Sequence, residues 1–337
     1  MASRLLNLCA LRAKPRKQAF RAWVVFWCCV MFNTASAQTF PSKPIQLWVP
    51  FAPGGSTDLF ARTVAEPLGK VLGQTVVVVH KAGGGGVVGA AELARAAPDG
   101  YTLGLATLSS AATNPAINPR VPYNPLTDFT PIINMLATPN VLAVHASFPA
   151  KDMAGLLKVL RAQPNRYDYA SSGLGGIAHL QMELFKSLSK TSVAHIAYSG
   201  AGPALRDVVG GQVPIIFDNL PSALPHIQAG RLVAVAVATP QRVADLPNVP
   251  TFKELGLDAV NRPALYGIWG PKGMSPALVA QLNQAIRQVL QDPAVIKRIE
   301  ATGSKVVANS PAQFAAQLKD EYLLYKKVVD DQKLKLD

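Results

Sequence analysis

The sequence predicts an α/β protein with two lobes and a ligand cleft between them. Apolar runs rich in β-branched residues alternate along the chain with stretches in which apolar residues recur at helical spacing. Strands that are apolar throughout and separated by helices are typical of a mainly parallel sheet flanked by helices. A leader of 37 residues would leave 300 of the 337 residues, which is enough for about two domains.

The N-terminal segment predicts export. Residues 1–21 carry six basic residues and no acidic one, and residues 22–32 form an apolar stretch. Ala35-Ser36-Ala37 then fits the small-residue pattern of a cleavage site, so we expect a signal peptide over residues 1–37 and a mature chain that begins at Gln38. The alternative, a membrane anchor, is disfavoured because a spanning helix needs about 20 apolar residues.

The composition beyond the leader excludes several classes of chemistry. All three cysteines, Cys9, Cys28 and Cys29, lie in the leader, so the remainder has no disulfide, thiolate nucleophile or cysteine metal site. The whole chain has 33 basic and 20 acidic residues, and without the six basic residues of the leader the excess is +7. This excess favours small anions as partners. Nucleic acid is not expected, because the basic residues are scattered and no RNA-binding motif appears.

Each lobe is expected to contain strands that alternate with helices. In the helix after the first strand, for example, Phe60, Val64, Leu68 and Leu72 recur at helical spacing. In the first lobe we expect strands over 45–51, 75–80 and 101–107 and helices over 57–73 and 89–97. In the second lobe we expect strands over 141–146, 167–172, 192–198, 213–218 and 232–238 and helices over 154–163, 178–189, 203–211 and 220–230.

Short connections are expected to join the lobes. The proline-punctuated segment 239–257 is expected to cross from the second lobe to the first. A strand over 264–271 and helices over 276–291 and 311–329 then complete the first lobe. The expected division is lobe 1 over residues 40–138 and 264–337 and lobe 2 over residues 139–263, with a hinge between them.

The loop over residues 50–62 has the composition of an anion site. Gly54 and Gly55 allow the backbone to approach a ligand closely, and Ser56, Thr57 or Asp58 can cap the helix that follows. Free N–H groups at a helix start attract anions. The alternative reading is a tight turn between a strand and a helix, without a ligand.

Three further loops repeat this combination of strand, hydroxyl groups, glycines and helix. They span residues 171–185, 198–211 and 106–115, and the last of them carries Thr107, Ser109 and Ser110. Because ligands of open α/β sheets bind at the carboxyl ends of the strands, several such loops favour one shared cleft for a small carboxylate.

The sequence gives less support to cofactor binding, metal binding or hydrolysis. Gly84-x-Gly86-x-x-Gly89 and Gly173-x-Gly175-x-x-Ala178 match the dinucleotide fingerprint, but neither has a convincing acid about 20 residues later, so no cofactor is expected. The histidines show no zinc-binding spacing, so no metal is expected. His179 lies either near the ligand or against the loop backbone. A hydrolase that uses Ser172 with His179 stays open, although no Gly-x-Ser-x-Gly motif is present.

From about Pro41 to the C-terminus the chain resembles the Bug receptors, the periplasmic solute-binding proteins of tripartite tricarboxylate transporters. The motifs that carry the resemblance include PFAPGGSTDLFAR, SSGLGGIAHLQMELF, YSGAGPALRDVVGG and PNVPTFKELGL. The resemblance implies a type II periplasmic-binding-protein fold that closes about a hinge. It also implies a monomer in the periplasm that binds a carboxylate, largely through backbone amides, and passes it to membrane transporter subunits. A sensor input for a membrane histidine kinase is the alternative within this fold.

The resemblance also implies a set of ligand contacts and no catalytic residue. In lobe 1 the contacts are Ala52, Gly54, Gly55, Ser56, Thr57 and Asp58, with Thr107, Ser109 and Ser110 nearby. In lobe 2 they are Ser172, Gly173, Gly176, Ile177, Ala178, Tyr198, Gly200, Ala201 and Asp218.

Two departures from the family pattern bear on the ligand. Relatives usually have hydroxyl residues where this chain has Gly176-Ile177-Ala178, and a lysine is common where this chain has Ser199. Both changes remove polar partners from the lobe 2 end of the cleft. We therefore expect a ligand with one firmly held carboxylate and a less polar far end, in preference to a tricarboxylate.

Overall fold

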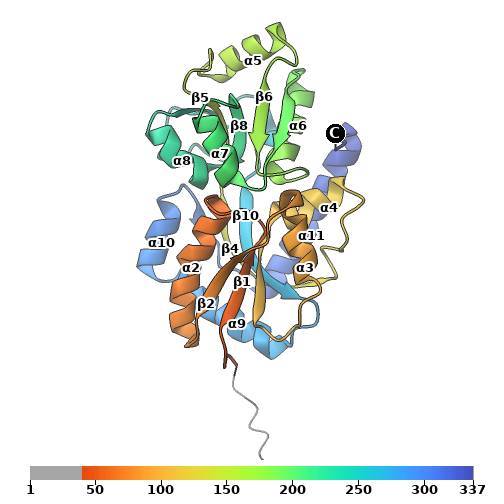
Figure 1. Cartoon of the computed structure of the whole chain (residues 1–337), viewed down its shortest axis with the longest axis vertical. Coiled ribbons are helices and arrows are strands. Elements are labelled where there is room, and N and C mark those ends of the chain that lie inside the picture. The colour runs from red at the N-terminus through yellow and green to blue at the C-terminus, as the bar shows by residue number, and fades with distance from the viewer. Residues whose placement is uncertain (1–39, 337) are drawn as a thin grey trace, which may run out of the picture. The chain divides into compact units, whose positions relative to one another are not determined.

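The computed structural model describes residues 40–336, so the predicted signal peptide lies outside the described residues. Residues 40–42 belong to a separate N-terminal unit, whereas Lys43–Asp337 forms one compact unit that contains every helix and strand of the described chain (Figure 1). This unit is built on two sheets with helices packed against them. The expectation of an α/β protein with two lobes is therefore confirmed.

The first sheet forms lobe 1 and has six strands. In spatial order they are β11 (Lys305–Val306), β4 (Phe129–Thr138), β10 (Ala264–Pro271), β3 (Thr102–Thr107), β1 (Ile45–Val49) and β2 (Val76–His80). Strand β1 runs parallel to β2 and β3, whereas β10 runs antiparallel to β3 and β4. The strand that returns late in the sequence thus lies at the centre of the sheet.

The second sheet forms lobe 2 and has five strands. In spatial order they are β7 (Ala194–Ala197), β6 (Asp168–Ser171), β8 (Ile215–Asn219), β5 (Asn140–His145) and β9 (Leu232–Ala238). Strand β6 runs parallel to β7 and β8, whereas β5 runs antiparallel to β8 and β9.

Both sheets are mixed, which corrects the expectation of mainly parallel sheets. Strands β1, β3, β6 and β8 end at the cleft. Strands β5 and β10 instead enter a lobe from the other one, so they begin near the cleft and run away from it. Each entering strand is therefore antiparallel to neighbours that end at the cleft. The order of elements along the chain does not reveal this reversal.

The helices cover the sheets, and the expected ones are present within a few residues of their predicted ends. Lobe 1 contains α2 (Ser56–Leu72), α3 (Val87–Leu93), α4 (Asn114–Ile117), α9 (Pro276–Leu290), α10 (Pro293–Glu300) and α11 (Pro311–Gln332). Lobe 2 contains α5 (Met153–Ala162), α6 (Ile177–Ser189), α7 (Ala201–Val209) and α8 (Leu220–Gln228). Local sequence explains several helix starts. Ser310, for example, caps α11 in a reciprocal capping box with Gln313.

The elements that were not expected include β4, β11, α4, α10 and the π-helical turn Ser109–Thr113. Strand β4 contains Pro131 and Asn134, which are unfavourable in strands. Tertiary contacts compensate for the asparagine, because the buried Asn134 side chain donates to Gln317 on α11 at 2.9 Å. Its backbone N–H donates to Asn309 at 2.8 Å.

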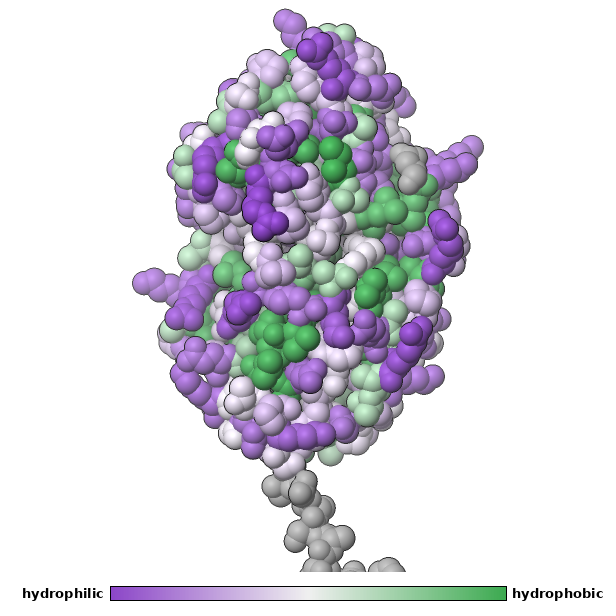
Figure 2. All heavy atoms as spheres, viewed as in Figure 1, coloured by the Kyte–Doolittle hydropathy of each residue, from purple (hydrophilic) through white to green (hydrophobic). Residues whose placement is uncertain are grey.

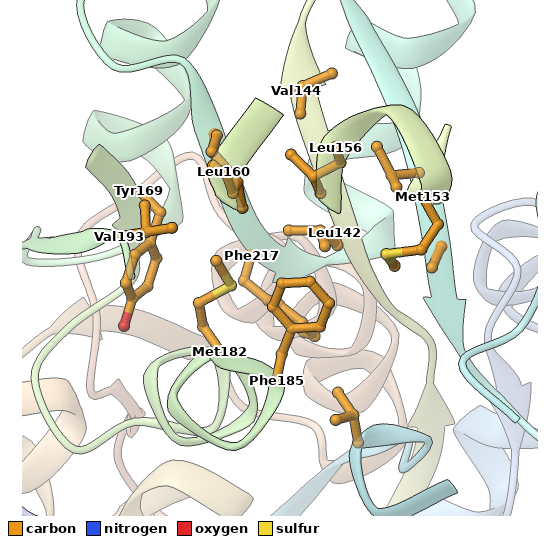
Figure 3. Close-up of a cluster of buried hydrophobic side chains, with 14 of the residues drawn as sticks. Leu142, Val144, Met153, Leu156, Leu160, Tyr169, Met182, Phe185, Val193 and Phe217 are labelled. Atoms are coloured by element: carbon orange, nitrogen blue, oxygen red, sulfur yellow. The ribbon is translucent and has the colours of Figure 1, made fainter. Parts of the chain in front are cut away.

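Lobe 2 has an apolar core on each face of its sheet. Figure 3 shows one of them, in which Leu142, Leu156, Phe185 and Phe217 pack together from β5, α5, α6 and β8. Val141, next to Leu142 on β5, belongs to the core on the opposite face with α7 and α8. Alternate side chains of one strand thus hold helices on both faces.

The segment between β9 and β10 packs on lobe 2 for most of its length. Phe252 is fully buried in the lobe 2 core, and its N–H donates to the carbonyl of Val237 at 3.0 Å. The expected crossing over 239–257 therefore comes later, next to Arg262, whose carbonyl accepts from Asn140 and Gln181 of lobe 2. The exact lobe boundaries remain a prediction.

The described helices include none long and apolar enough to cross a bilayer. Figure 2 shows hydrophilic residues over much of the visible face, with hydrophobic residues in separate patches. Among the exposed apolar side chains, Leu59 is 41% and Val77 is 42% exposed. Single exposed apolar residues of this kind are ordinary on protein surfaces.

Candidate functional site

The loops at the carboxyl ends of β1, β3, β6 and β7 meet at one narrow cavity. The cavity has room for about one water molecule. The predicted site residues that line it are Gly55, Ser56, Thr57, Thr107, Ser109, Ser172, Ile177 and Ala201. Both lobes contribute to this wall, as the common cleft requires.

The other residues that line the cavity were not predicted from the sequence. They are Phe51, Leu108, Asn219, Ala264, Leu265 and Tyr266. Asn219 ends β8 and accepts from the Tyr266 hydroxyl at 2.7 Å. Asn219 could have been found, because it follows an expected strand as the other site loops do. Tyr266 carried no local signal, since β10 reaches the cleft only through its central place in the lobe 1 sheet.

The two lobes touch directly, so the structure is closed. The Ala52 N–H donates to the Ser199 carbonyl at 3.0 Å. The Ile177 N–H donates to Ser109 Oγ at 3.0 Å. Ser56 Oγ and Ser222 Oγ are 2.8 Å apart. The contacts that close the lobes thus involve residues that were predicted as ligand contacts, namely Ala52, Ser56, Ser109 and Ile177.

Glycines permit this close contact. Gly173 has a φ of +149°, and a Cβ there would lie 2.7 Å from the Cα of Gly85 in lobe 1. A Cβ on Gly200 would lie 2.9 Å from the backbone nitrogen of Ala52. Real Cβ atoms do not approach so closely. Gly173 and Gly200 were predicted as ligand contacts, and here they allow one lobe to approach the other.

Asp58 holds the lobe 1 loop. Its Oδ2 accepts from the Gly54 N–H at 3.1 Å, and its Oδ1 accepts from Arg62 Nε at 2.8 Å. His80 Nε2 lies 3.1 Å from the same Oδ1. Asp58 is thus a buried carboxylate with basic partners, and it does not line the cavity. Through these bonds Asp58 orients the lobe 1 loop.

Ser109 and Ser110 have different places at the end of β3. Ser109 lines the cavity, whereas Ser110 is fully buried and bonded to Thr107 through both side chains at 3.1 Å. Tyr123 donates to the Ser110 carbonyl at 2.7 Å. Ser110 therefore shapes the turn that presents Thr107 and Ser109.

His179 bonds the loop backbone, the second of the two expected alternatives. Its Nδ1 accepts from the Gly175 N–H at 3.0 Å, and its ring stacks on His195 with centroids 4.0 Å apart. Burial, aided by the charge of Lys186, lowers the pKa of His179 to about 4. The ring is therefore neutral at pH 7, as an acceptor nitrogen requires.

This geometry gives the Ser172–His179 hydrolase no support. Nδ1 of His179 is used by Gly175, and Nε2 lies 3.7 Å from Glu183 Oε1. The serine and histidine that do pair are Ser171 and His195, with Oγ and Nε2 2.7 Å apart. Ser171 is fully buried, so a substrate does not reach its hydroxyl in this structure.

Several other predicted contacts lie behind the cavity wall. Tyr198 donates to Asp207 at 2.7 Å within lobe 2, and burial together with this carboxylate raises the pKa of Tyr198 to about 12. Ala178 belongs to the lobe 2 core. Ala52, Gly54 and Gly176 shape the loops without lining the cavity. Whether any of them meets a ligand remains a prediction.

Asp218 lies behind Ser56. It is 1% exposed, and its Oδ2 accepts from Ser222 Oγ at 2.7 Å. Burial raises the pKa of Asp218 to about 7, although hydrogen bonds from Ser222 and the Asn219 backbone act in the opposite direction. Within residues 40–336 no group of three metal-binding side chains is found.

Three helices begin at the cavity with a glycine at the N-cap position, although the closing contact from the Ile177 N–H to Ser109 Oγ occupies the first N–H of α6. Their N-cap residues are Gly55 of α2, Gly176 of α6 and Gly200 of α7, and none of the three has a side chain that can bond the first N–H groups. Free N–H groups at helix starts carry partial positive charge. The arrangement can therefore receive a small anion.

Comparison with known proteins finds similar chains over most of the length. BugT of Bordetella pertussis is 37% identical over 302 residues, which cover 89% of this chain and 93% of BugT. A solved periplasmic transporter is 48% identical with a TM-score of 0.87, covering 88% of this chain and 100% of that one.

Two solved structures from R. palustris contain carboxylates. One protein, with adipate, is 31% identical with a TM-score of 0.84, covering 88% of this chain and 99% of that one. MatC, with bound malate, is 31% identical with a TM-score of 0.83, covering 86% of this chain and 100% of that one. The family model of the tripartite tricarboxylate transporter family receptor matches residues 60–334. The chain therefore belongs to the receptor family of tripartite tricarboxylate transporters, which includes the Bug proteins that its loops resemble.

Proposed function

We propose that this protein is a periplasmic receptor that captures a small carboxylate and delivers it to the membrane subunits of a tripartite transporter. One observation carries the proposal: α2, α6 and α7 all begin at the same cavity with glycine N-caps, whose own side chains cannot bond the first N–H groups. Solved relatives with adipate and malate support the carboxylate class. The role is binding without catalysis, as in the binding proteins that the chain resembles.

The energies are sufficient for useful affinity. A helix N-terminus contributes about 0.3–1 kcal/mol to binding an anion, and up to about 2 kcal/mol where it is partly buried. Charge-assisted hydrogen bonds from Ser56, Thr57 or Thr107 add about 1.5–3 kcal/mol each. A few such contacts reach the roughly −8 kcal/mol of micromolar binding after the cost of association.

Apolar residues of the wall support a less polar far end on the ligand. Phe51, Leu108, Ile177 and Leu265 line the cavity beside the hydroxyl groups. They can pack against an alkyl chain or ring but offer no partner to a further carboxylate held close to the first, as in malate or citrate. We therefore infer that an aromatic or medium-chain acid binds more tightly than a tricarboxylate.

Calorimetry with citrate, malate, adipate and benzoate tests the binding role. Adipate or benzoate should bind with a micromolar Kd, and citrate most weakly. Thr57→Val removes a cavity hydroxyl and should weaken binding roughly tenfold or more. Thr63→Val is the matched control, because Thr63 lies on the same helix but bonds the Leu59 carbonyl away from the cavity. If none of the four acids binds, the proposal is wrong.

Uptake by a deletion strain tests the transport role. Loss of the gene should slow uptake of the acid that binds, and the wild-type gene should restore it. Unchanged uptake would instead favour the sensor alternative. Fractionation with N-terminal sequencing tests the location, and recovery of the chain with Met1 intact in the periplasm would contradict the predicted cleavage before Gln38.

A further inference from the structure

Asp218 is a buried carboxyl group beside a site proposed for carboxylates. Two hydrogen bonds, 2.7 Å from Asp218 Oδ2 to Ser222 Oγ and 2.8 Å from Ser222 Oγ to Ser56 Oγ, connect it to the cavity wall. The distance from Asp218 to the wall therefore cannot exceed the sum of these two bonds. A bound carboxylate on Ser56 would lie close enough for strong repulsion of an ionised Asp218, because little water separates them.

The groups around Asp218 do not neutralise it. Asp218 bonds Ser222 of α8, which links it to Ser56 of α2. The Tyr266 phenol of β10 is close enough for the charge of Asp218 to raise its pKa. Burial raises the pKa of Tyr266, so this phenol is neutral at pH 7. Strand β5 places Val141 opposite Asp218. Among the described residues, no basic side chain acts on the pKa of Asp218.

The basic groups on and beside the neighbouring helices α2 and α8 do not supply a free positive charge. Arg62 on α2 is paired with Asp58 at 2.8 Å, and His80 lies against the same carboxylate. His226 lies one turn after Ser222 on α8, where burial and the charge of Arg231 lower its pKa. An added negative charge at the cavity is therefore best accommodated by neutralising Asp218 itself.

The hydroxyl chain favours the same state. When Asp218 is ionised, Ser222 donates to it, and the Ser56 hydroxyl turns toward Ser222, away from the cavity. When Asp218 is protonated, it donates to Ser222, which then donates to Ser56 Oγ, 2.8 Å away. Ser56 is then free to donate into the cavity. A proton on Asp218 thus both removes a repulsion and provides a donor.

We propose that Asp218 takes up a proton when a carboxylate binds at Ser56, so that this receptor captures its ligand together with a proton. The inference rests on the proposed function. The raised pKa of Asp218, about 7, is consistent with it, because a modest further increase would keep the group protonated in the complex at neutral pH. The affinity for a carboxylate should then fall about tenfold per pH unit once free Asp218 is ionised.

Calorimetry with adipate tests this over about pH 6.5 to 9, where adipate itself is fully ionised. Titrations in two buffers of different ionisation enthalpy give the number of protons taken up, which should be greatest between the pKa of Asp218 in the free protein and its higher pKa in the complex. Asp218→Asn should abolish the uptake and flatten the pH dependence. Asp245→Asn is the matched control, because Asp245 is an exposed carboxylate with no link to Ser56, and it should retain the uptake.

Several results would overturn the inference. They are an affinity that does not vary with pH, a wild type that takes up no proton, and uptake that persists in Asp218→Asn. If that variant does not fold, infrared difference spectra of the wild type decide, since adipate at about pH 8.5 should produce a protonated-carboxyl band. Absence of the band would contradict the idea. If adipate, malate, citrate and benzoate all fail to bind at every pH, the proposed function itself is wrong.

Discussion

The two walls of the cavity hold their buried polar groups in different ways. On the lobe 1 side, Asp58 has Arg62 and His80 within 2.8 and 3.1 Å. On the lobe 2 side, Asp218 has only hydroxyl and backbone partners, and His179 is neutral and accepts from a backbone N–H. Because the lobe 1 charge is compensated, we expect pH to act on this protein mainly through lobe 2.

The largest expected effect is on stability at Asp218. Its pKa is about 7 in the folded protein against 3.8 in the unfolded chain, so the folded state binds the proton more tightly. Stability should therefore fall as pH rises from about 4 to about 7, by roughly 4 kcal/mol in total for this group. Asp218→Asn lacks this loss, so its free energy of unfolding should rise relative to the wild type over the same range. Urea denaturation at several pH values measures the difference in free energy of unfolding between the variant and the wild type. If this difference does not change with pH, Asp218 is not the uncompensated carboxyl group that distinguishes lobe 2 from lobe 1.

His179 should show the opposite sign. Its pKa is lowered from 6.5 to about 4, so the folded state favours the neutral ring. The stability contributed by this group is lost as pH falls from about 6.5 to about 4, by roughly 3 kcal/mol. His179→Gln keeps an acceptor for Gly175 but does not titrate, so the loss should be absent. The same denaturation series tests this, and comparing each variant with the wild type separates the two opposing effects. An equal loss at low pH in His179→Gln would show that the ring is not responsible.

Loss of the Asp58 hydrogen bonds in lobe 1 should weaken ligand binding. Asp58→Ala removes the acceptor of the Gly54 N–H and leaves His80 without its carboxylate partner. A hydrogen bond to a charged group contributes about 1.5–3 kcal/mol, so affinity for adipate should fall about 10- to 100-fold. Arg62→Ala is a milder comparison, because the Arg62 side chain is 62% exposed and such pairs contribute little. If Asp58→Ala binds adipate as tightly as the wild type, Asp58 does not orient the loop for binding.

The smallest expected effect concerns ligand choice. Ile177 lines the cavity, whereas Ala178 packs in the lobe 2 core. Ile177→Thr should therefore shift preference from adipate toward malate by about 1 kcal/mol, through one added hydrogen bond. Ala178→Ser should instead reduce stability, because it buries a hydroxyl among apolar side chains. Calorimetry with both acids measures the shift, and a change in selectivity from Ala178→Ser alone would contradict this division.

The sequence by itself determined most local elements and the loops that matter. Periodic apolar residues predicted α2, glycines with hydroxyls marked the loops after β1 and β6, and continuous apolar runs predicted the strands of lobe 2. These features depend on residues close together in the chain. The same loops carried the family resemblance, which the comparisons then confirmed.

Only the tertiary structure decided which residues share the cavity and what charge they carry. Tyr266 reaches Asn219 because β10 lies between β3 and β4, a pairing of strands far apart in sequence. Asp58 and Asp218 are both aspartates near strand ends at the cleft. Asp58 accepts a hydrogen bond from the charged Arg62, whereas Asp218 accepts one from the neutral Ser222. The pKa of a carboxyl group depends on burial and on neighbours brought from other elements. No local pattern in the sequence contains that information, because it arises only when the lobes fold and come together.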